Sequence, residues 1–420
     1  MRKILPFNKI NIQKDLLFLL IIGGLYSLGI FLSNTFVNVY FWKQSGEYHT
    51  IAIYNLAIYV AQPLTFILAG KLAKKIERII VLRLGVIFLS LFFLSVLLIG
   101  EKVSTYNYML GTLLGIGYGF YWLAFNVLTF EITEPDTRDF FNGFLGVLQS
   151  FGGMIGPLLA GLVIANMTKN SGYTVIFTVS FILFVCAVIC SFFLKRRQAD
   201  GKFELVKVMK ERHSNKNWRR ILYSHVFQGL REGMFLFVIT IWVYVLTQSE
   251  FALGIFNFVL SGVSIVFYFI SIKFIKAHLR KKAILYGGII LYLAIYIIIF
   301  DMTYTHLLIY AVIIGMAHPI INVPYVSMTY DVIGRARFAK EFRVEYIVVR
   351  ELFANLGRVI SILIFLFFIT IYQAEKVIPL LLIIFGASHL FVYPFIRRIQ
   401  LRPRQKEVMV KEQIPDEKNR

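Results

Sequence analysis

Five charged side chains lie inside two apolar stretches in the second half of the chain. Arg231 and Glu232 stand within HVFQGLREGMFLFVIT (225–240), and Arg350, Glu351 and Arg358 stand within VEYIVVRELFANLGRV (344–359). A guanidinium offers a planar fork of donors to an anionic or strongly polar group. A glutamate that exchanges its charge partner in a low dielectric can bind and release a proton. These residue types therefore indicate substrate binding with proton transfer, or buried ion pairs that fix one helix to another.

Helical spacing gathers these charges with further polar residues. Two stripes result, one of His225, Gln228 and Glu232, and one of Glu351, Asn355 and Arg358. If both helices run outward from the cytoplasm, a rise of about 1.5 Å per residue brings Arg231, Glu232 and Arg358 to one depth. Arg350 and Glu351 then form a second layer nearer the cytoplasm. A charge at the bilayer centre costs roughly 3 kcal/mol on insertion scales, so the cluster needs a structural or functional reason to exist.

The composition is that of a membrane protein. Of the 420 residues, 58% are hydrophobic and only 16% are charged, and a soluble protein of this length cannot bury so much apolar surface in one core. A helix needs about 20 apolar residues to cross the hydrocarbon. Twelve runs meet this condition and predict an all-α membrane protein: 16–42, 51–72, 79–100, 108–131, 141–166, 173–194, 221–247, 251–275, 283–301, 306–331, 346–372 and 377–396.

The distribution of lysine and arginine predicts the orientation. The formal net charge of +21 is concentrated in short tracts between the apolar runs, which argues against a nucleic-acid-binding face. Every second loop is poor in lysine and arginine, and together these loops carry only Lys43, Lys102, Lys169 and Lys376. Because basic loops stay inside, we expect both termini in the cytoplasm and the chain in the cell (plasma) membrane of a bacterium. The first run is too long for a signal-peptide core, so it is expected to be the first membrane helix.

The chain divides into two related halves. We expect a six-helix bundle over 1–194, a cytoplasmic linker over 195–220, a second six-helix bundle over 221–396 and a cytoplasmic tail over 397–420. An internal repeat supports this division, because Thr129-Phe130-Glu131-Ile132 recurs 200 residues later as Thr329-Tyr330-Asp331-Val332. The fold predicted is therefore twelve transmembrane helices in two pseudo-symmetric bundles, with the site between the halves.

Other kinds of chemistry have little support in the sequence. The two cysteines, Cys186 and Cys190, are spaced i, i+4 in one apolar run and are expected to be packing residues. We see no disulfide framework, metal site or cofactor site, and no phosphate-binding G-x4-G-K-[ST] loop that would make ATP the energy source. No nucleophile–base pair stands out, so we do not expect an enzyme.

The run 141–166 contains a spaced set of small residues, GFLGVLQSFGGMIGPLLAG. At this point the chain resembles the major facilitator superfamily, whose antiporter signature is G-x8-G-x3-G-P-x2-G-G. Ala160 replaces one glycine of that signature. The resemblance implies an antiporter, whereas ordinary close helix packing is the alternative. The matching residues are Gly143, Gly152, Gly156, Pro157 and Gly161.

Two loop patterns are also similar to those of the superfamily. GKLAKKIERI resembles the loop signature G-x-L-a-D-r-x-G-r-r, but Lys74 stands at the aspartate, Glu77 at the glycine and Ile79 at a basic position. Glu131 and Arg138 have the E-x6-R spacing of sugar porters, with Asp331 as the counterpart of Glu131 in the repeat. The resemblance implies that such residues gate the cytoplasmic face. Solvated loop charges are the alternative. The positions of the loop signature that fit are Gly70, Leu72, Lys75 and Arg78.

The resemblance also implies that the seventh and eleventh membrane helices are neighbours beside a central cavity. The two polar stripes could then face each other. The first half lacks a mid-membrane acid, and its candidates for the cavity are polar and aromatic. Opposite them, the run 306–331 carries an imidazole that can titrate near neutral pH, followed by two prolines that interrupt the helix. These further candidates are Asn34, Gln62, Tyr121, Trp122, Asn126, His318 and Asn322.

We therefore expect a secondary transporter that works by alternating access, with proton-coupled efflux of a small amphipathic or anionic compound. Its partners would be the small-molecule substrate, protons and the lipid bilayer, and we expect a monomer. Transfer of lipid-linked cargo between leaflets is the first alternative, and uptake of a sugar or organic acid is the second. A non-transporting receptor or scaffold is an alternative of a different class.

Overall fold

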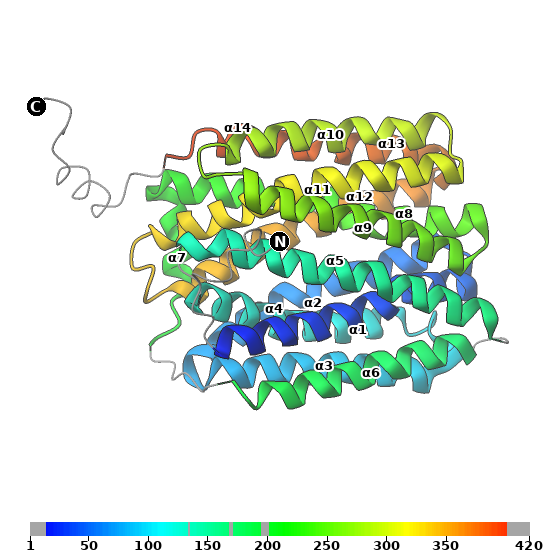
Figure 1. Ribbon diagram of the computed structural model, residues 1–420, viewed down its shortest axis with the longest axis horizontal. Helices are drawn as coiled ribbons and strands as arrows, with labels where there is room; N and C mark the ends of the chain where they lie inside the picture. Colours follow the sequence, from blue (N-terminus) through cyan, green and yellow to red (C-terminus); the bar gives the residue numbers. More distant parts are fainter. Residues whose placement is uncertain (1–13, 133–134, 168–170, 195–200, 401–420) are drawn as a thin grey trace, which may run out of the picture.

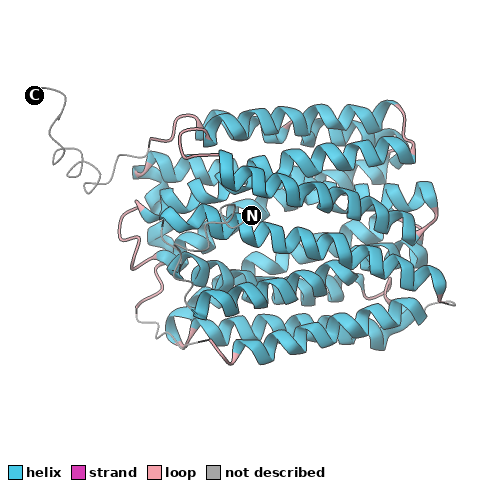
Figure 2. Ribbon diagram, viewed as in Figure 1, coloured by secondary structure: helices cyan, strands magenta, loops and turns pink. Residues whose placement is uncertain are grey.

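The computed structural model describes residues 14–132, 135–167, 171–194 and 201–400, with side chains left out for 14–16, 130, 132 and 135–140. Within these residues the chain is helical and no strand is present (Figure 2). The helices are α1 (Lys14–Ser45), α2 (Tyr48–Lys75), α3 (Arg78–Ile99), α4 (Asn107–Ile132), α5 (Pro135–Asn166), α6 (Ser171–Ser191), α7 (Leu205–Ser214), α8 (Lys216–Thr247), α9 (Glu250–Phe274), α10 (Arg280–Phe300), α11 (Tyr304–Gly334), α12 (Arg343–Ile371), α13 (Ala374–Gly386) and α14 (Ser388–Ile396), with a short 3-10 turn at Gly100–Lys102.

Among the described residues, twelve segments are long and apolar enough to span a membrane, which confirms the predicted fold class. The last span consists of α13 and α14 together, and it is interrupted at Ala387. The short helix α7 lies within the predicted linker, and α8 begins at Lys216 rather than at residue 221. The turn of α8 that precedes the apolar run is polar, so hydropathy alone placed its start too late.

The helices form two bundles that lie side by side (Figure 1). In this view α1–α6 occupy the lower part and α8–α14 the upper part. The largest contacts between the halves are those of α5 with α9 and of α2 with α12. We call the face at which α1 begins and α14 ends the termini face, on the left of Figure 1, and the opposite face the far face.

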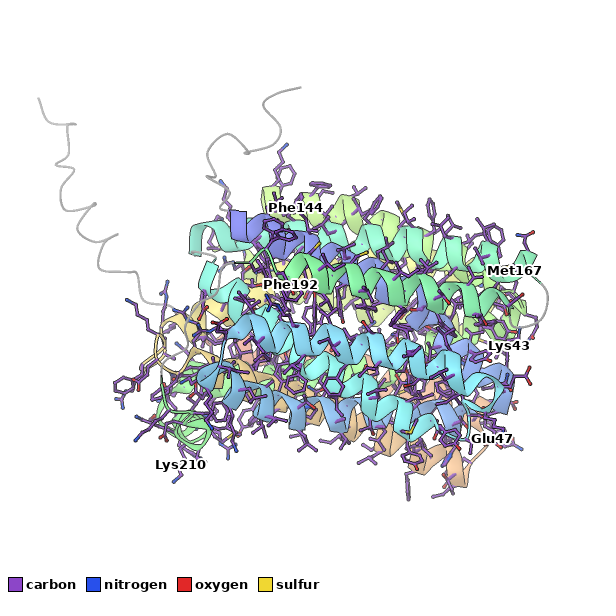
Figure 3. The ribbon with its side chains drawn as sticks, turned by 90° about the horizontal axis from the view of Figure 1, so that it is seen from below. Lys43, Glu47, Phe144, Met167, Phe192 and Lys210 are labelled. Atoms are coloured by element: carbon purple, nitrogen blue, oxygen red, sulfur yellow. The ribbon has the colours of Figure 1, made fainter. Side chains whose placement is uncertain are left out.

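The outer surface is apolar, as a protein solvated by lipid requires. Large hydrophobic side chains are exposed on it, including Leu98 at 79% and Phe300 at 83% of their full area. Figure 3 shows side chains covering the flanks of the helices, with Lys210 near one end of the molecule and Lys43 and Glu47 near the other. The apolar band between the charged ends is the part that fits the hydrocarbon of a bilayer.

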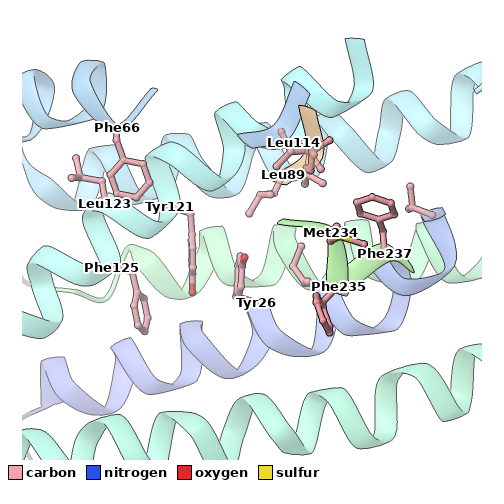
Figure 4. Packing of buried hydrophobic residues seen from close by; sticks show 14 of the residues in the cluster. Tyr26, Phe66, Leu89, Leu114, Tyr121, Leu123, Phe125, Met234, Phe235 and Phe237 are labelled. Atoms are coloured by element: carbon pink, nitrogen blue, oxygen red, sulfur yellow. The ribbon is translucent and has the colours of Figure 1, made fainter. Parts of the chain in front are cut away.

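An aromatic cluster fills the core of the first half. The rings of Tyr26 and Tyr121 stack with their centroids 3.9 Å apart, and Phe125 stacks on Tyr121 at 5.5 Å (Figure 4). Trp122 meets both tyrosine rings edge-on. The cluster packs α1 against α4, and its members Trp122 and Phe125 also line the cavity described below.

In the second half, α8 and α12 approach each other to backbone contact. A Cβ atom on Gly229 would lie 2.0 Å from the carbonyl oxygen of Ala354, and one on Gly357 would lie 2.1 Å from the carbonyl oxygen of Val226. Neither position leaves room for a side chain, because the opposing atoms belong to helix backbone. The glycines therefore set the separation of the two helices that carry the charged cluster.

Replacing Gly357 with alanine is expected to lower the free energy of unfolding by about 1–3 kcal/mol, since the added methyl group forces two packed helices apart. The midpoint of thermal unfolding of the purified protein measures this loss. Gly24→Ala is the matched control, because no atom lies within 4 Å of a Cβ there, and it should leave the midpoint unchanged or raise it. Equal midpoints for the two variants would show that the close approach is not needed.

Candidate transport cavity

A cavity of about 260 Å³ lies between the two halves. Its walls come from α2, α4 and α5 of the first half and from α8, α11 and α12 of the second. Trp122 and Phe125 contribute aromatic surface on one side. The polar and charged residues of its lining are Gln62, Asn126, Thr129, Asn142, Gln149, His225, Gln228, Asn322, Tyr325, Tyr330, Arg350, Glu351 and Arg358.

One ion pair joins α8 to α12 beside this cavity. Nη2 of Arg358 donates to Oε2 of Glu232 at 2.7 Å, and Nε of Arg358 donates to the same oxygen at 3.1 Å. The other carboxylate oxygen accepts from Nε2 of Gln228 at 2.7 Å, and Nη1 of Arg358 donates to Oδ1 of Asn355 at 3.1 Å. The two predicted stripes thus face each other. About a fifth of each charged side chain remains accessible, 18% for Arg358 and 23% for Glu232.

The same arginine also reaches the other half. Its guanidinium carbon lies 5.2 Å from the ring centroid of Tyr59 on α2. Arg358 is therefore in contact with groups on both sides of the plane along which the halves would separate. A change in the partner of Arg358 would therefore alter contacts in both halves.

A second ion pair lies nearer the termini face, where the sequence predicted a second layer. Arg350 pairs with its neighbour Glu351, and the guanidinium carbon of Arg350 lies 5.7 Å from the ring centroid of Tyr330. The hydroxyl of Tyr330 donates to Oδ1 of Asn126 at 3.1 Å, from α11 to α4. This layer therefore also spans both halves.

Several cavity residues were missed by the sequence analysis. Asn142 and Gln149 lie on one face of α5 at i, i+7, a spacing that could have revealed them. Tyr325 bonds Nδ1 of His225 at 2.7 Å and Oγ of Ser224 at 2.9 Å. Their amide and hydroxyl groups are common in packed membrane helices, so residue type alone gave little signal.

Other predicted candidates lie outside the lining of this cavity, among them Glu232 and Asn355, which are connected to it through their bonds with Arg358. The guanidinium of Arg231 is buried at 4.5 Å from the ring centroid of Phe235, and its Nε has no partner among the described residues. Tyr121 is fully buried in the aromatic cluster. Asn34 is half-buried on α1, and His318 is exposed on α11 one turn from Asn322, which does line the cavity.

Ion pairs connect the halves at the termini face. Nζ of Lys74 on α2 lies 2.6 Å from Oε1 of Glu345 on α12, and both side chains are buried. Lys74 also donates to the carbonyl oxygen of Glu341 at 2.8 Å. Glu131 pairs with Arg78 of its own half at 3.0 Å and with Arg343 of the other half at 3.6 Å. The lysine that departs from the family pattern thus has a glutamate opposite it.

The remaining gating candidates differ in their surroundings, because some contact other segments and one is exposed. A Cβ on Gly70 would lie 2.7 Å from the ring of Phe203 and 3.0 Å from Val348. The absence of a side chain at Gly70 therefore lets the linker and α12 pack closely against α2. Lys75 is exposed. Asp331 pairs with Arg280 at 2.8 Å, which repeats in the second half the pairing of Glu131 with Arg78. Arg138 lies in the stretch 135–140, whose side chains are outside the described residues.

A further inter-half tie lies at the far face and was not predicted. Nζ of Lys43 on α1 lies 2.9 Å from Oε1 of Glu250 on α9. The hydroxyl of Tyr173 on α6 donates to the same oxygen at 2.9 Å. The cavity therefore lies between two layers of inter-half ion pairs.

The small-residue motif of α5 places this helix between α1 and α9. A Cβ on Gly156 would lie 2.8 Å from the backbone nitrogen of Leu32 on α1, and one on Gly161 would lie 2.6 Å from the carbonyl oxygen of Glu250 on α9. Gly143 faces Ile272 on α9, Gly152 faces Ser27 on α1, and the carbonyl oxygen of Pro157 faces Gly254. Close packing is therefore one role of the motif, and that packing includes an interface between the halves.

Metal chemistry finds no obvious place in the described part of the chain. No group of three or more His, Cys, Asp or Glu residues there could hold a metal ion. Cys186 and Cys190 are both free.

Known proteins resemble this chain along most of its length. The family model described as the Major Facilitator Superfamily matches residues 19–362. An uncharacterized protein of Bacillus subtilis (strain 168), YqgE, is 57% identical over 398 residues, which cover 95% of this chain and 93% of that protein. Two solved structures have the same fold at 13% identity. The Escherichia coli fucose:proton symporter has a TM-score of 0.66 and covers 92% of this chain and 98% of its own. A bacterial homologue of the iron transporter ferroportin, in an outward-facing state, has a TM-score of 0.67 with 92% and 99% covered.

These findings confirm the predicted resemblance and the predicted two-bundle fold of transporters. They assign the chain to membrane transport by a multi-pass membrane protein, and they favour a transporter over an enzyme. The chain belongs to the Major Facilitator Superfamily.

Proposed function

We propose that this protein is a proton-coupled secondary transporter that exports a small amphipathic compound across the cell membrane. The observation that carries the proposal is the Arg358–Glu232 pair, whose arginine lines the central cavity and whose carboxylate lies directly behind it. The lysine and arginine bias assigns the termini face to the cytoplasm. Alternating access would then open the ties at the two faces in turn.

The lining of the cavity suits a small molecule with both apolar and polar parts. Trp122 and Phe125 offer aromatic surface, while Gln62, Asn126 and Gln149 offer amide donors and acceptors. Small-ligand sites combine a mostly apolar wall with a few placed polar groups. A volume of about 260 Å³ limits the cargo to a small compound unless the halves move apart.

Competition for Glu232 would couple the compound to protons. A hydrogen-bond donor group of the substrate would bind the Glu232 carboxylate in place of a proton. Substrate and proton would then oppose each other's binding, and linkage makes this opposition reciprocal. An antiporter needs this negative coupling between substrate binding and proton binding, because inward flow of protons then drives the substrate outward. The α5 motif, which resembles the antiporter signature, favours the same sign.

An anionic substrate is the second candidate, and the two guanidinium groups in the lining favour it. An anion that takes Arg358 from Glu232 releases the carboxylate, which then binds a proton more readily. Anion and proton would in that case bind together and travel in the same direction. The sign of the coupling therefore discriminates between the two candidates.

The test uses full-length protein in liposomes that contain an internal pH dye. Pools of amphipathic drugs, organic anions, sugars and lipid-linked sugars are added in turn, and the pH change inside is followed. We expect an amphipathic pool to trigger proton movement opposite to its own, measured with labelled compound. Proton movement together with an organic anion would support the second candidate. Response to lipid-linked sugars alone, or binding without flux in every pool, would overturn the proposal.

A further inference from the structure

A second cavity, of about 920 Å³, lies at the termini face, apart from the transport cavity. Four segments that are distant in the sequence surround it. They are the end of α7, the first turns of α8, the turn that follows α11, and the residues that follow α14. None of its lining residues belongs to the lining of the central cavity.

The lining of this second cavity is strongly cationic. Lys216, Arg220, Arg335, Arg337 and Arg398 contribute to it, against the single carboxylate of Glu211. The positive-inside rule explains why lysine and arginine are frequent at this face. It does not explain why five of them surround one hollow.

The carboxylate of Glu211 is occupied by hydrogen bonds from the walls of the cavity. Its Oε1 accepts from Nδ2 of Asn215 at 3.2 Å and from the backbone nitrogen of Arg337 at 3.3 Å, and its Oε2 accepts from the hydroxyl of Tyr346. The carboxylate thus holds the walls together. In the described part of the chain, no carboxylate forms an ion pair with the side chain of Lys216, Arg220, Arg337 or Arg398.

The wall that carries Arg398 is fixed by hydrogen bonds. Nη1 of Arg220 donates to the carbonyl oxygen of Arg398. Nδ2 of Asn217 donates to the carbonyl oxygen of Gln400 at 2.8 Å, and Nζ of Lys281 donates to that of Ile399 at 2.6 Å. The segment after α14 is therefore held against α8, and the cations of the four segments are brought together in a built cavity.

We propose that this cavity binds a polyanion that carries phosphate groups. Guanidinium groups bind phosphate oxygens through paired, charge-assisted hydrogen bonds. Two sources offer this chemistry at a cytoplasmic membrane face, namely the headgroup of an anionic phospholipid and a soluble polyphosphate. Either ligand would bridge the four segments, so its binding would raise the stability of the folded protein.

The experiment measures thermal unfolding of the full chain in nanodiscs at constant ionic strength. One arm keeps the lipid phosphatidylcholine and titrates inorganic pyrophosphate. The other arm omits pyrophosphate and raises the fraction of cardiolipin. We expect the unfolding midpoint to rise with at least one probe, and the arm that responds identifies the source.

Two double variants make the test specific. Arg337→Gln with Arg398→Gln removes two cations of the cavity, and we expect the apparent affinity for the active probe to fall about tenfold or more. Arg219→Gln with Arg397→Gln makes the same charge change at exposed neighbouring positions outside the lining, and it should change the affinity by less than about twofold. Arg398→Gln alone is the milder variant if the first pair does not fold. No response of the natural sequence to either probe, or equal losses in both double variants, would overturn the proposal.

Discussion

Replacing Glu232 with glutamine is expected to abolish proton-driven accumulation of the substrate while exchange of labelled for unlabelled substrate continues. Glutamine keeps the shape and can still accept a hydrogen bond from Arg358, but it cannot bind and release a proton. Linked sites typically change each other's affinity about 5- to 150-fold. We expect this pH-dependent change in substrate affinity to disappear in the variant. Flux driven by a pH gradient, compared with exchange at equal pH in the same liposomes, measures the effect.

The control for this variant is Glu375→Gln, at the exposed start of α13. It removes the same charge at a distance from the cavity and should leave both driven flux and exchange unchanged. Arg358→Gln is the complementary change. It leaves the Glu232 carboxylate without its ionic partner, and we expect unfolding to become easier by about 2–3 kcal/mol, a value reduced from that of a fully buried pair because both groups are partly accessible. Driven flux that persists in Glu232→Gln would assign the pair a structural role alone.

Replacing Glu345 with glutamine is expected to open the termini face. The Lys74–Glu345 pair is buried, with side-chain exposures of 5% and 0%, and loss of one partner of such a pair costs about 3–5 kcal/mol. Because the pair connects α2 to α12, most of this cost falls on the conformation in which that face is closed. A shift of about 3 kcal/mol changes the ratio of the two conformations by more than a hundredfold.

Accessibility of a cysteine placed in the cavity reports this shift. In a background with Cys186→Ser and Cys190→Ser, Gln149→Cys is treated with a membrane-impermeant thiol reagent from the termini face. We expect much faster labelling with Glu345→Gln, and unchanged labelling with Glu341→Gln, which removes an exposed carboxylate nearby. Lys74→Met with Glu345→Met should restore slow labelling, because an apolar pair of similar volume often replaces a buried ion pair. Equal rates in all variants would show that these residues do not control the opening.

The membrane helices could be predicted from the sequence because the signal is physical and local. A run of about 20 apolar residues has few alternatives to a membrane span. The end of a span is less certain, and the polar first turn of α8 was missed for this reason. The interruption of the last span at Ala387 is flanked only by Gly386 and the polar pair Ser388-His389, which is too short to lower the mean hydropathy of a 20-residue run.

That the polar stripes of α8 and α12 could face each other was predictable because two independent constraints agreed. Equal depth came from helical rise, and adjacency of the two helices came from the family resemblance. Arg231 has the same depth and the same adjacency, yet it lies on a different face of α8, since one residue rotates a helix by about 100°. Residue type cannot decide which of two neighbouring charges points to a cavity. That decision depends on the packing of α12 against Gly229 and Gly233.

The ties between the halves were the least predictable part of the site. Lys74 was identified as a departure from a loop pattern, but its partner, Glu345, lies 271 positions away in the sequence. The tie at the far face joins Lys43 to Glu250 over a similar separation, 207 positions. Charges near helix ends are common, and only the three-dimensional arrangement shows which of them meet.

The most direct test of the central claim is to count the protons that the purified protein exchanges when its substrate binds. Calorimetric titration in two buffers of different ionisation enthalpy gives this number and its sign at each pH. We expect a transfer of about one proton per bound substrate in the natural sequence, and no transfer in Glu232→Gln. Release of the proton would establish the antiport sign, and uptake the anion–proton sign. Binding without proton exchange at any pH, or with the same exchange in the variant, would contradict the account.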